Sequence, residues 1–556
     1  MCGIFWEGIM AQLVDVRSPT SVSDVPIQAE CRSTKLSAPV GICQGYQMIT
    51  GSGCFTALKG ETESSGGTST VICKVCTSIE ELSESLEVDQ SLSVSFLGAA
   101  SVDEKLKLIE QQKITTNSIS IVVYAKHNMG TETVTDVGLK PGIQIPASTK
   151  EVKDFVNSYG DCFLSSKTRG GEYFAMYTFY SETREEQRDL SVEMKAQGLF
   201  SPVSIDASFQ VKLNNFLKSQ KVHSSFRQIM SGIANPEFPT QDKLIEFALK
   251  FPSLELTAPV ITSFKTSGYE RVPGMSTCFY QVGKNRELLT GRQKKPNFIA
   301  DLCRLQQLKN DISTVKEAYG FYGTGFFDED TKLKTRETEV EADVVKAERL
   351  LEEYVDDPTK PITDTPVLTS LIQGLTPSLD YVVKRSQEYG SPASPARPTT
   401  AFNDVNDAGT FFSQRTKIKT IEILDMGNDL LGVVRITYSS KKDTWTVSHG
   451  RTAWSSFSSV AKMVLSAGEF VTNVRTCYVS SGPLMIGVSF KTSDNRQIST
   501  DAGFPFNGQW NLPKGCFLMG FAGVCGNDYG VFRLQMIYGS FRPVTWDTLD
   551  RDIHSL

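Results

Sequence analysis

The chain contains 556 residues and carries a net charge of −6, with 40% hydrophobic and 22% charged residues. That length is too great for a single hydrophobic core, so we expect several domains. The slightly acidic balance gives no reason to expect nucleic acid as a partner, and no stretch approaches the ~20 consecutive apolar residues of a transmembrane helix. The N-terminus has no basic region ahead of its apolar patch and is a poor signal peptide.

Residue patterns that indicate catalysis or metal binding are sparse. The CxxC pair of Cys73 and Cys76 has no second pair or histidines beside it, which favours buried cysteines over a zinc site. The four histidines, His127, His223, His449 and His554, lie outside any HExxH motif, and GxSxG and Walker A motifs are missing. We therefore predict no catalytic residues, no metal and no cofactor. The alternative, an enzyme with a binding appendage, would need a pocket that joins His127 or His223 to a nucleophile.

The chain divides into four regions, and the pattern as a whole predicts an α+β fold. Residues 1–290 alternate strands with amphipathic segments after an irregular start that ends at about residue 35. Residues 291–397 are mostly helical and charged, and they end in a Pro- and Ser-rich linker at 389–400. Residues 398–541 contain short strands separated by Gly-containing turns, which is typical of an all-β domain, and 542–556 form a tail.

Two segments of the helical region have a strong helical period. Asn297 to Tyr319 and Glu337 to Val355 each place apolar residues three or four positions apart along one face. We interpret both as helices that pack against a larger domain.

The most informative segment runs from Tyr159 to Gly171. It reads as a strand, a polar turn, the glycine pair Gly170 and Gly171, and a further strand. Paired glycines in β structure permit close backbone approaches and are natural pivots, although a plain glycine bulge explains them equally well.

This segment resembles the signature of the membrane-attack-complex/perforin family of pore-forming proteins. That signature is an aromatic residue, Gly, Thr, His and an aromatic residue, followed after six residues by Gly-Gly. The matching residues are Tyr159, Gly160, Phe163, Gly170 and Gly171, whereas Asp161 and Cys162 replace Thr and His. The resemblance implies a bent central β-sheet flanked by helical clusters that refold into membrane-spanning hairpins, and it makes the five matching residues a candidate hinge.

The two segments that flank the signature, 78–126 and 185–232, have mixed patterns. Parts of each have a helical period, yet residues 203–213 alternate strictly between apolar and polar. Eleven alternating residues suit a strand that crosses a bilayer, although an ordinary half-buried strand is the alternative. The predicted lipid-facing residues are Val203, Ile205, Ala207, Phe209, Val211 and Leu213.

The C-terminal region resembles the jacalin-related lectins, which implies a β-prism. The matching positions are Ile418, Ile421, Ile423, 434–438, His449, Gly450, 465–469, 502–506, Leu512, Pro513 and 520–526. These lectins bind a sugar with a glycine-rich first loop and an Asp in the last loop. In this sequence the first loop offers Gly409 alone, and an ungapped match to that Asp falls on Gly530.

We therefore expect the candidate ligand-binding residues to be Gly409, Asn527, Asp528 and Tyr529. An altered site would bind a larger glycan, a lipid headgroup or a protein in place of a simple hexose.

Together the two resemblances predict a pore-forming protein. It would be secreted or released as a soluble protein, bind a target membrane lipid surface through a glycan or other receptor, form a homo-oligomer and insert β-hairpins as a barrel. The alternative is a non-lytic carbohydrate-binding protein whose perforin-like module never inserts.

Overall fold

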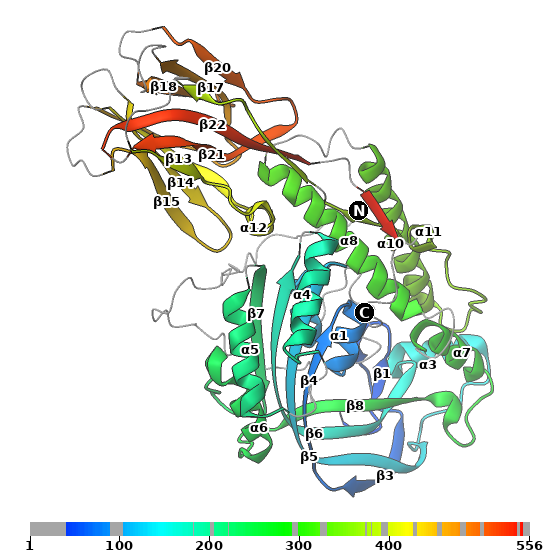
Figure 1. The fold of residues 1–556 in the computed structure, drawn as a ribbon. Helices are drawn as coiled ribbons and strands as arrows, with labels where there is room; N and C mark the ends of the chain where they lie inside the picture. Colours follow the sequence, from blue (N-terminus) through cyan, green and yellow to red (C-terminus); the bar gives the residue numbers. More distant parts are fainter. Residues whose placement is uncertain are drawn as a thin grey trace.

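The computed structural model describes residues 41–548 except 89–103, 182, 201–204, 221, 292–297, 323–330, 373–374, 380, 391–397, 426–430, 453–458, 479–484, 501–504, 527 and 542–544. An N-terminal part with a large sheet, a layer of long helices and a C-terminal β-domain follow one another through the molecule (Figure 1). The expected mixture of α and β structure is therefore confirmed.

The N-terminal part is built on one eight-stranded antiparallel sheet. Its strands are β1 (Gly45–Gln47), β2 (Ser52–Gly53), β3 (Leu58–Ser65), β4 (Thr68–Cys76), β5 (Ser118–Leu139), β6 (Cys162–Tyr180), β7 (His223–Ser231) and β8 (Val260–Gly268). Strands β5 and β6 run through the whole sheet, with β4 and β7 beside one half and β3 and β8 beside the other. We call these halves the upper arm and the lower arm, and Figure 1 shows that they meet at a sharp bend.

Helices cover both faces of the upper arm. One face carries α1 (Ile79–Ser85) and α2 (Glu104–Gln111), and the other carries α4 (Arg184–Ala196), α5 (Ala207–Ser219) and α6 (Leu244–Lys250). Alternate side chains of β5 divide between these two cores, with Ile121 on the side of α4–α6 and Val122 on the side of α1 and α2. A strand buried on both faces reads as a nearly continuous apolar run, which explains the composition of β5 here.

Helix α5 occupies part of the segment whose alternation suits a membrane strand, so this segment is helical in the form described, and its role as a membrane strand stays a prediction. Asp206 caps the helix by accepting hydrogen bonds from the backbone N–H groups of Ser208 and Phe209. Phe209, Leu213 and Phe216 then recur at helical spacing and are buried. The predicted lipid-facing set comprises buried Phe209 and Leu213, partly buried Ile205, exposed Ala207 and Val211, and Val203, which lies outside the described residues.

Both predicted long helices are present. They are α8 (Phe298–Tyr322) and α10 (Thr331–Asp356), and α7 (Phe279–Thr290) precedes them. Helix α3 (Thr149–Tyr159) leads into β6, and the short helices are η2 (Gln241–Lys243), η3 (Phe251–Ser253), η4 (Tyr269–Arg271), α11 (Thr369–Ile372) and α12 (Ala408–Ser413). In the described part of the chain no helix is both long and apolar enough to cross a membrane.

The C-terminal domain consists of three antiparallel sheets around a shared core. The first contains β10 (Tyr381–Arg385), β11 (Tyr389–Gly390), β12 (Thr400–Asn403), β21 (Cys516–Gly526) and β22 (Gly530–Phe541). The second contains β13 (Lys417–Asp425), β14 (Leu431–Ser439), β15 (Thr444–Gly450) and β16 (Ser459–Val464). The third contains β17 (Val471–Tyr478), β18 (Met485–Thr492), β19 (Gln497–Thr500) and β20 (Gly508–Asn511).

This domain starts earlier in the chain than residue 398. Strands β10 and β11 pair with β22, so residues that the sequence placed in the connecting region belong to the first sheet. Residues of the predicted tail also form a strand, β23 (Thr545–Thr548), which pairs with β9 (Leu375–Ser378).

An aromatic cluster joins α8 to the C-terminal domain. The ring of Tyr322 stacks on Phe517 with 4.2 Å between ring centroids, and Tyr319 lies 5.0 Å from Phe541. Phe412 of α12 packs against the same rings. The helical layer and the C-terminal domain therefore share one hydrophobic core.

Candidate functional site

The first candidate site is the bend of the central sheet. Strand β6 pairs with β8 up to Gly170 and with β7 from Glu172 onward, so its neighbour changes at the glycine pair. Strand β5 changes its neighbour between Asn128 and Thr131, where its register with β6 shifts. The bend therefore lies where both central strands exchange one partner strand for another.

The glycine pair is required at this point by close backbone contacts. A Cβ atom on Gly170 would lie 2.0 Å from the carbonyl oxygen of His127, and one on Gly171 would lie 2.8 Å from that of Ser231. Real Cβ atoms do not approach backbone oxygens so closely, so these positions tolerate only glycine. The glycines thus lie at a close approach of three strands, while their action as a pivot stays a prediction.

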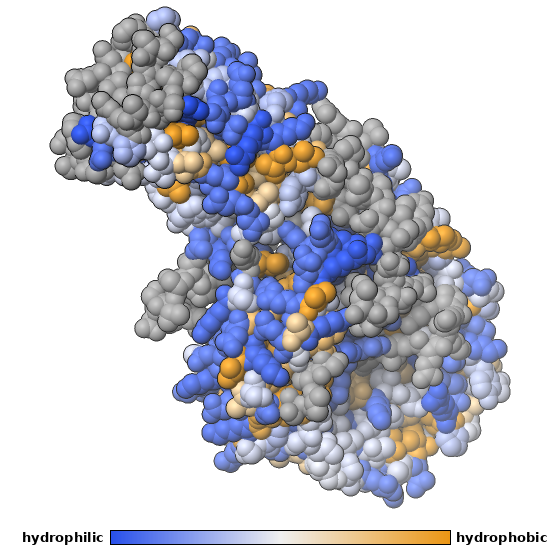
Figure 2. All heavy atoms as spheres, viewed as in Figure 1, coloured by the Kyte–Doolittle hydropathy of each residue, from blue (hydrophilic) through white to orange (hydrophobic). Residues whose placement is uncertain are grey.

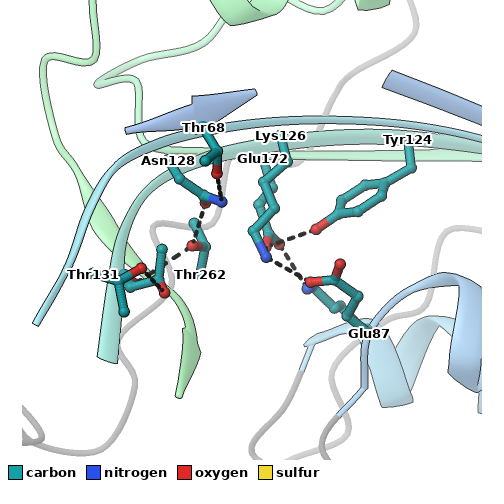
Figure 3. Close-up of polar contacts among 10 residues, drawn as sticks. Thr68, Glu87, Tyr124, Lys126, Asn128, Thr131, Glu172 and Thr262 are labelled. Carbon is teal, nitrogen blue, oxygen red and sulfur yellow. Dashed lines mark hydrogen bonds and ion pairs between the residues drawn. The ribbon is translucent and has the colours of Figure 1, made fainter. Parts of the chain in front are cut away.

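A cluster of charged groups lies beside the bend, on the face covered by α1 and α2, and its members are largely buried apart from the half-exposed Glu87 (Figure 3). The Glu172 carboxylate accepts a hydrogen bond from the Tyr124 hydroxyl at 2.9 Å and pairs with Lys105 of α2 at 2.7 Å. Lys126 lies between Glu172, at 3.9 Å, and Glu87, at 2.5 Å, which follows α1. Burial, followed by the charge of Glu172, raises the pKa of Tyr124. The cluster ties both helices to the residue that follows the glycine pair.

Hydroxyl and amide groups continue the row of polar side chains past the bend (Figure 3). We call the cluster of charged groups and these side chains together the polar strip. Asn128 donates a hydrogen bond to Thr68 at 3.1 Å and accepts one from Thr262 at 3.1 Å. The hydroxyls of Thr131 and Thr168 lie 2.8 Å apart across β5 and β6. Water can replace hydrogen bonds of this kind at small net cost, whereas it cannot replace apolar packing. The bend therefore contains polar contacts that water could replace.

The other signature residues lie at the start of β6. Gly160 ends α3 with a positive φ of 78°, and a Cβ atom there would lie 2.4 Å from the backbone of Tyr46. The carbonyl oxygen of Tyr159 accepts a hydrogen bond from Tyr269 at 2.7 Å, and Phe163 is buried in the same aromatic core. The five signature residues thus lie at two separate places, the junction of α3 with β6 and the bend.

Asp161, which departs from the family signature, is completely buried. Its carboxylate accepts hydrogen bonds from the Met48 N–H at 3.0 Å and from the Tyr354 hydroxyl at 2.5 Å. Arg286 donates to its backbone oxygen at 2.6 Å. Burial raises the pKa of Asp161, and the nearby Arg286 charge opposes that rise. Sequence reasoning could not assign this residue a role, because its partners lie 113 to 193 positions away.

The second candidate site is the turn between β21 and β22, which contains Asp528 and Tyr529. Asp528 is exposed and Tyr529 is partly buried, whereas Asn527 lies outside the described residues. Gly409, which the sequence placed in the same site, belongs to α12. That helix packs through Phe412 against the opposite end of the β21–β22 hairpin. The structure therefore does not bring Gly409 to the turn.

A different segment lies beside the turn. Gly390 of β11 pairs with Arg533, and a Cβ atom on Gly526 would lie 3.3 Å from the carbonyl oxygen of Pro398. Both ends of the 390–398 segment, which the sequence assigned to a linker, therefore approach the hairpin. Arg533 also pairs with Glu388 at 3.2 Å, which adds charged groups near the turn.

Comparison with known proteins identifies the C-terminal domain. Residues 405–530 match the family model of the jacalin-like lectin domain. The predicted lectin domain and its β-prism are therefore confirmed for this region, which contains both four-stranded sheets and strand β21 of the five-stranded one. A search of curated proteins found no match to the chain.

Solved structures of plant lectins also align with part of the chain. Wild-type Malaysian banana lectin is 13% identical, with a TM-score of 0.22, and the alignment covers 29% of this chain and 99% of that one. The agglutinin of Calystegia sepium is 17% identical, with a TM-score of 0.22, over 29% of this chain and 97% of that one. Calsepa lectin in complex with a bisected glycan is 16% identical, with a TM-score of 0.21, over 28% and 96%.

Proposed function

We propose that this protein binds a glycan-bearing membrane surface through its lectin domain, assembles there with further copies of itself and inserts strands from its N-terminal sheet as a pore. It would be released as a soluble protein and then associate with the target membrane. The proposed action involves no catalysis and no cofactor. The family match of residues 405–530 supports the glycan as a partner.

The observation that carries the membrane part of the proposal is where the helical clusters lie in the chain. Helices α1 and α2 form the connection from β4 to β5, and α4 and α5 form the connection from β6 to β7. Each connection contains about 40 residues, enough for two strands of the ~10 residues that cross a bilayer. Extension of either connection would lengthen a pair of strands that is already present in the upper arm.

The bend supports the same proposal. The glycine pair, the polar strip and the exchange of partner strands all lie at one level of the sheet. On the face drawn in Figure 2, apolar residues occur in small separate groups among hydrophilic ones. Insertion would use apolar side chains such as Phe209 and Leu213 of α5, which are buried in this form.

Because Phe209 is buried in the core, a charge at this position would damage the soluble fold and would not test insertion. Val211 is 58% exposed on α5 and belongs to the predicted lipid-facing set. Val211→Arg should change stability by less than about 0.5 kcal/mol. In a bilayer the same charge would cost about 2–4 kcal/mol per copy.

The matched control is Ser208→Arg, which adds the same charge at an exposed position on the polar side of the alternation. We expect Val211→Arg to bind vesicles coated with target-cell glycans but to release little dye, and Ser208→Arg to release dye like the parent. Equal dye release from both variants would exclude residues 203–213 as a membrane strand. Binding without leakage from the parent protein would leave only the lectin activity.

A further inference from the structure

Helices α7, α8 and α10, which we call the brace, contact both arms of the bent sheet. Figure 1 shows α8 and α10 passing from the top of the upper arm to the side of the lower arm, across the open side of the angle. We propose that the brace holds the angle between the arms, and that its contact with the upper arm is the one released when the sheet opens. Because the inference concerns how the sheet opens, it rests on the proposed function.

The lower arm is attached to the brace through Asp161. Tyr354 of α10 donates to the Asp161 carboxylate, and Arg286 of α7 donates to its backbone oxygen. Arg286 also pairs with Glu270 at 2.5 Å. All of these groups are at least largely buried, and an arginine compensates the buried carboxylates. A buried charge network of this kind is costly to break, because either partner would be left alone.

The upper arm is attached through Asp311 of α8. Its carboxyl accepts hydrogen bonds from the N–H group of Thr116 at 2.8 Å and from the Thr116 hydroxyl at 3.1 Å. Next to it, Asn310 donates to the carbonyl oxygen of Ile114 at 2.9 Å. Asp311 is buried, with 4% of its surface exposed. In the described part of the chain its carboxyl nevertheless forms no ion pair.

The two attachments are therefore unequal. The lower one contains a buried arginine beside its carboxylates. In the upper one the buried Asp311 carboxyl has hydrogen bonds but, among the described residues, no cation, since the neighbouring ion pair of Lys113 with Glu317 at 3.1 Å is exposed. Ile299 and Cys303 of α8 add apolar packing. Burial without a compensating charge raises the pKa of Asp311 to about 8, so ionisation would weaken the contact. Thr116 and Ile114 also belong to the β4–β5 connection, which the proposed function extends. Release of the upper attachment and extension of that connection would thus be one event.

The test measures the angle between the arms directly, in solution and without lipid. Spin labels on genetically encoded residues at Glu63 of β3 and Ser224 of β7 report the distance between the lower and the upper arm in the full chain. Asp311→Ala removes the upper attachment, whereas Asp311→Asn keeps an acceptor for the Thr116 N–H and a partner for its hydroxyl. Val488→Ala in the lectin-domain core controls for general destabilisation.

We expect one distance population in the parent, in Asp311→Asn and in Val488→Ala, and an additional longer population in Asp311→Ala. If Asp311→Ala does not fold, Thr116→Val removes one of the two hydrogen bonds and should also show the longer population. A single unchanged distance population in folded Asp311→Ala or Thr116→Val overturns the proposal. So does a longer population in Asp311→Asn as large as that in Asp311→Ala. Since no membrane is present, a protein that never releases dye can still pass this test.

Discussion

Asp311 in the brace and Glu469 in the lectin domain are both buried, yet their surroundings differ. Asp311 has only the two hydrogen bonds from Thr116, and burial raises its pKa to about 8. Glu469 pairs with Arg496 and also accepts hydrogen bonds from Ser466 and Thr492, and the Arg496 contact lowers its pKa to about 2. At neutral pH the lectin domain therefore keeps its buried charge fully compensated, whereas the brace holds a carboxyl that favours the neutral form.

The sheets of the N-terminal part and of the lectin domain also differ in the contacts that hold them together. The lectin domain closes three sheets around one core, and its strands remain within a single sheet each. The N-terminal sheet passes through a bend that is filled with polar contacts. The comparison indicates one region that is built to keep its shape and another that contains exchangeable contacts at the point where a change of shape would occur.

The largest expected effect concerns the residue at which the lectin domain begins. A fragment that starts at residue 375 contains β10 and β11. One that starts at residue 398 lacks these two of the three strands that pair with β22, and it lacks the Tyr381 ring that stacks on Phe412 at 3.7 Å. We expect the longer fragment to unfold cooperatively and the shorter one to be unfolded, as measured by thermal unfolding and amide dispersion in NMR spectra. A stable shorter fragment would show that the domain does begin at the linker.

The next effect concerns the bend. In Gly170→Ala the added Cβ would meet the backbone of His127, so the strands must separate. We expect a loss of at least about 3 kcal/mol in the stability of the N-terminal sheet, with the lectin domain unaffected. Gly138→Ala, in β5 where it pairs with β3 and with open space around its Cβ, is the control. Similar denaturation midpoints for the two variants would contradict a backbone contact at the bend.

A third effect separates the two regions by pH. The folded protein retains the Asp311 proton to about pH 8, whereas an unfolded Asp loses it near pH 4. The folded form thus binds more protons in this window, and stability falls as pH rises through it. Asp311→Asn should remove this decline, with a gain on the order of a few kcal/mol at pH 8.

The lectin domain should show the opposite trend in acid. Because the pKa of Glu469 is lowered to about 2, its contribution is present above about pH 4 and is lost as pH falls toward 2. Denaturant unfolding of the parent and of Asp311→Asn between pH 2 and 9, followed separately for each region, measures both slopes. Parallel slopes for the parent and the variant would refute the role of Asp311.

The smallest effect concerns the ligand. Free mannose or galactose should compete poorly for binding to target cells, because Gly530 occupies the place of an acidic residue. Asp528→Asn and Tyr529→Ala should each weaken cell binding by about 1–2 kcal/mol if the turn contacts a larger glycan. Calorimetric titration of the fragment from residue 375 measures the affinity. A sub-millimolar dissociation constant for a single hexose would restore an ordinary sugar site.

Patterns within one element were predictable from the sequence. The periods of 297–319 and 337–355 correctly indicated α8 and α10, and the glycine pair does lie at a close approach of strands. The alternation from residue 203 could not show which form the segment takes here, because the same residues contain apolar positions at helical spacing and Asp206 caps the helix. Contacts between distant segments could not be predicted from the sequence. Glu172, Lys126 and Lys105, for example, form ion pairs only because the folded sheet brings them together. The start of the lectin domain was missed because strands of its first sheet, β11 and β12, lie on both sides of the Pro- and Ser-rich stretch in the sequence.

Because the Tyr322 ring stacks on Phe517, a rotation of the lectin domain would tilt α8 about this aromatic junction. An α-helix rises about 1.5 Å per residue, so Asp311 lies about 16 Å along the axis from Tyr322, and a tilt of roughly 10° at the junction would displace it by about 3 Å. A displacement of that size exceeds the tolerance of a hydrogen bond. A lectin domain that settles on a crowded surface could therefore transmit its change of orientation mechanically, through a stiff rod, to the contact that holds the upper arm in place.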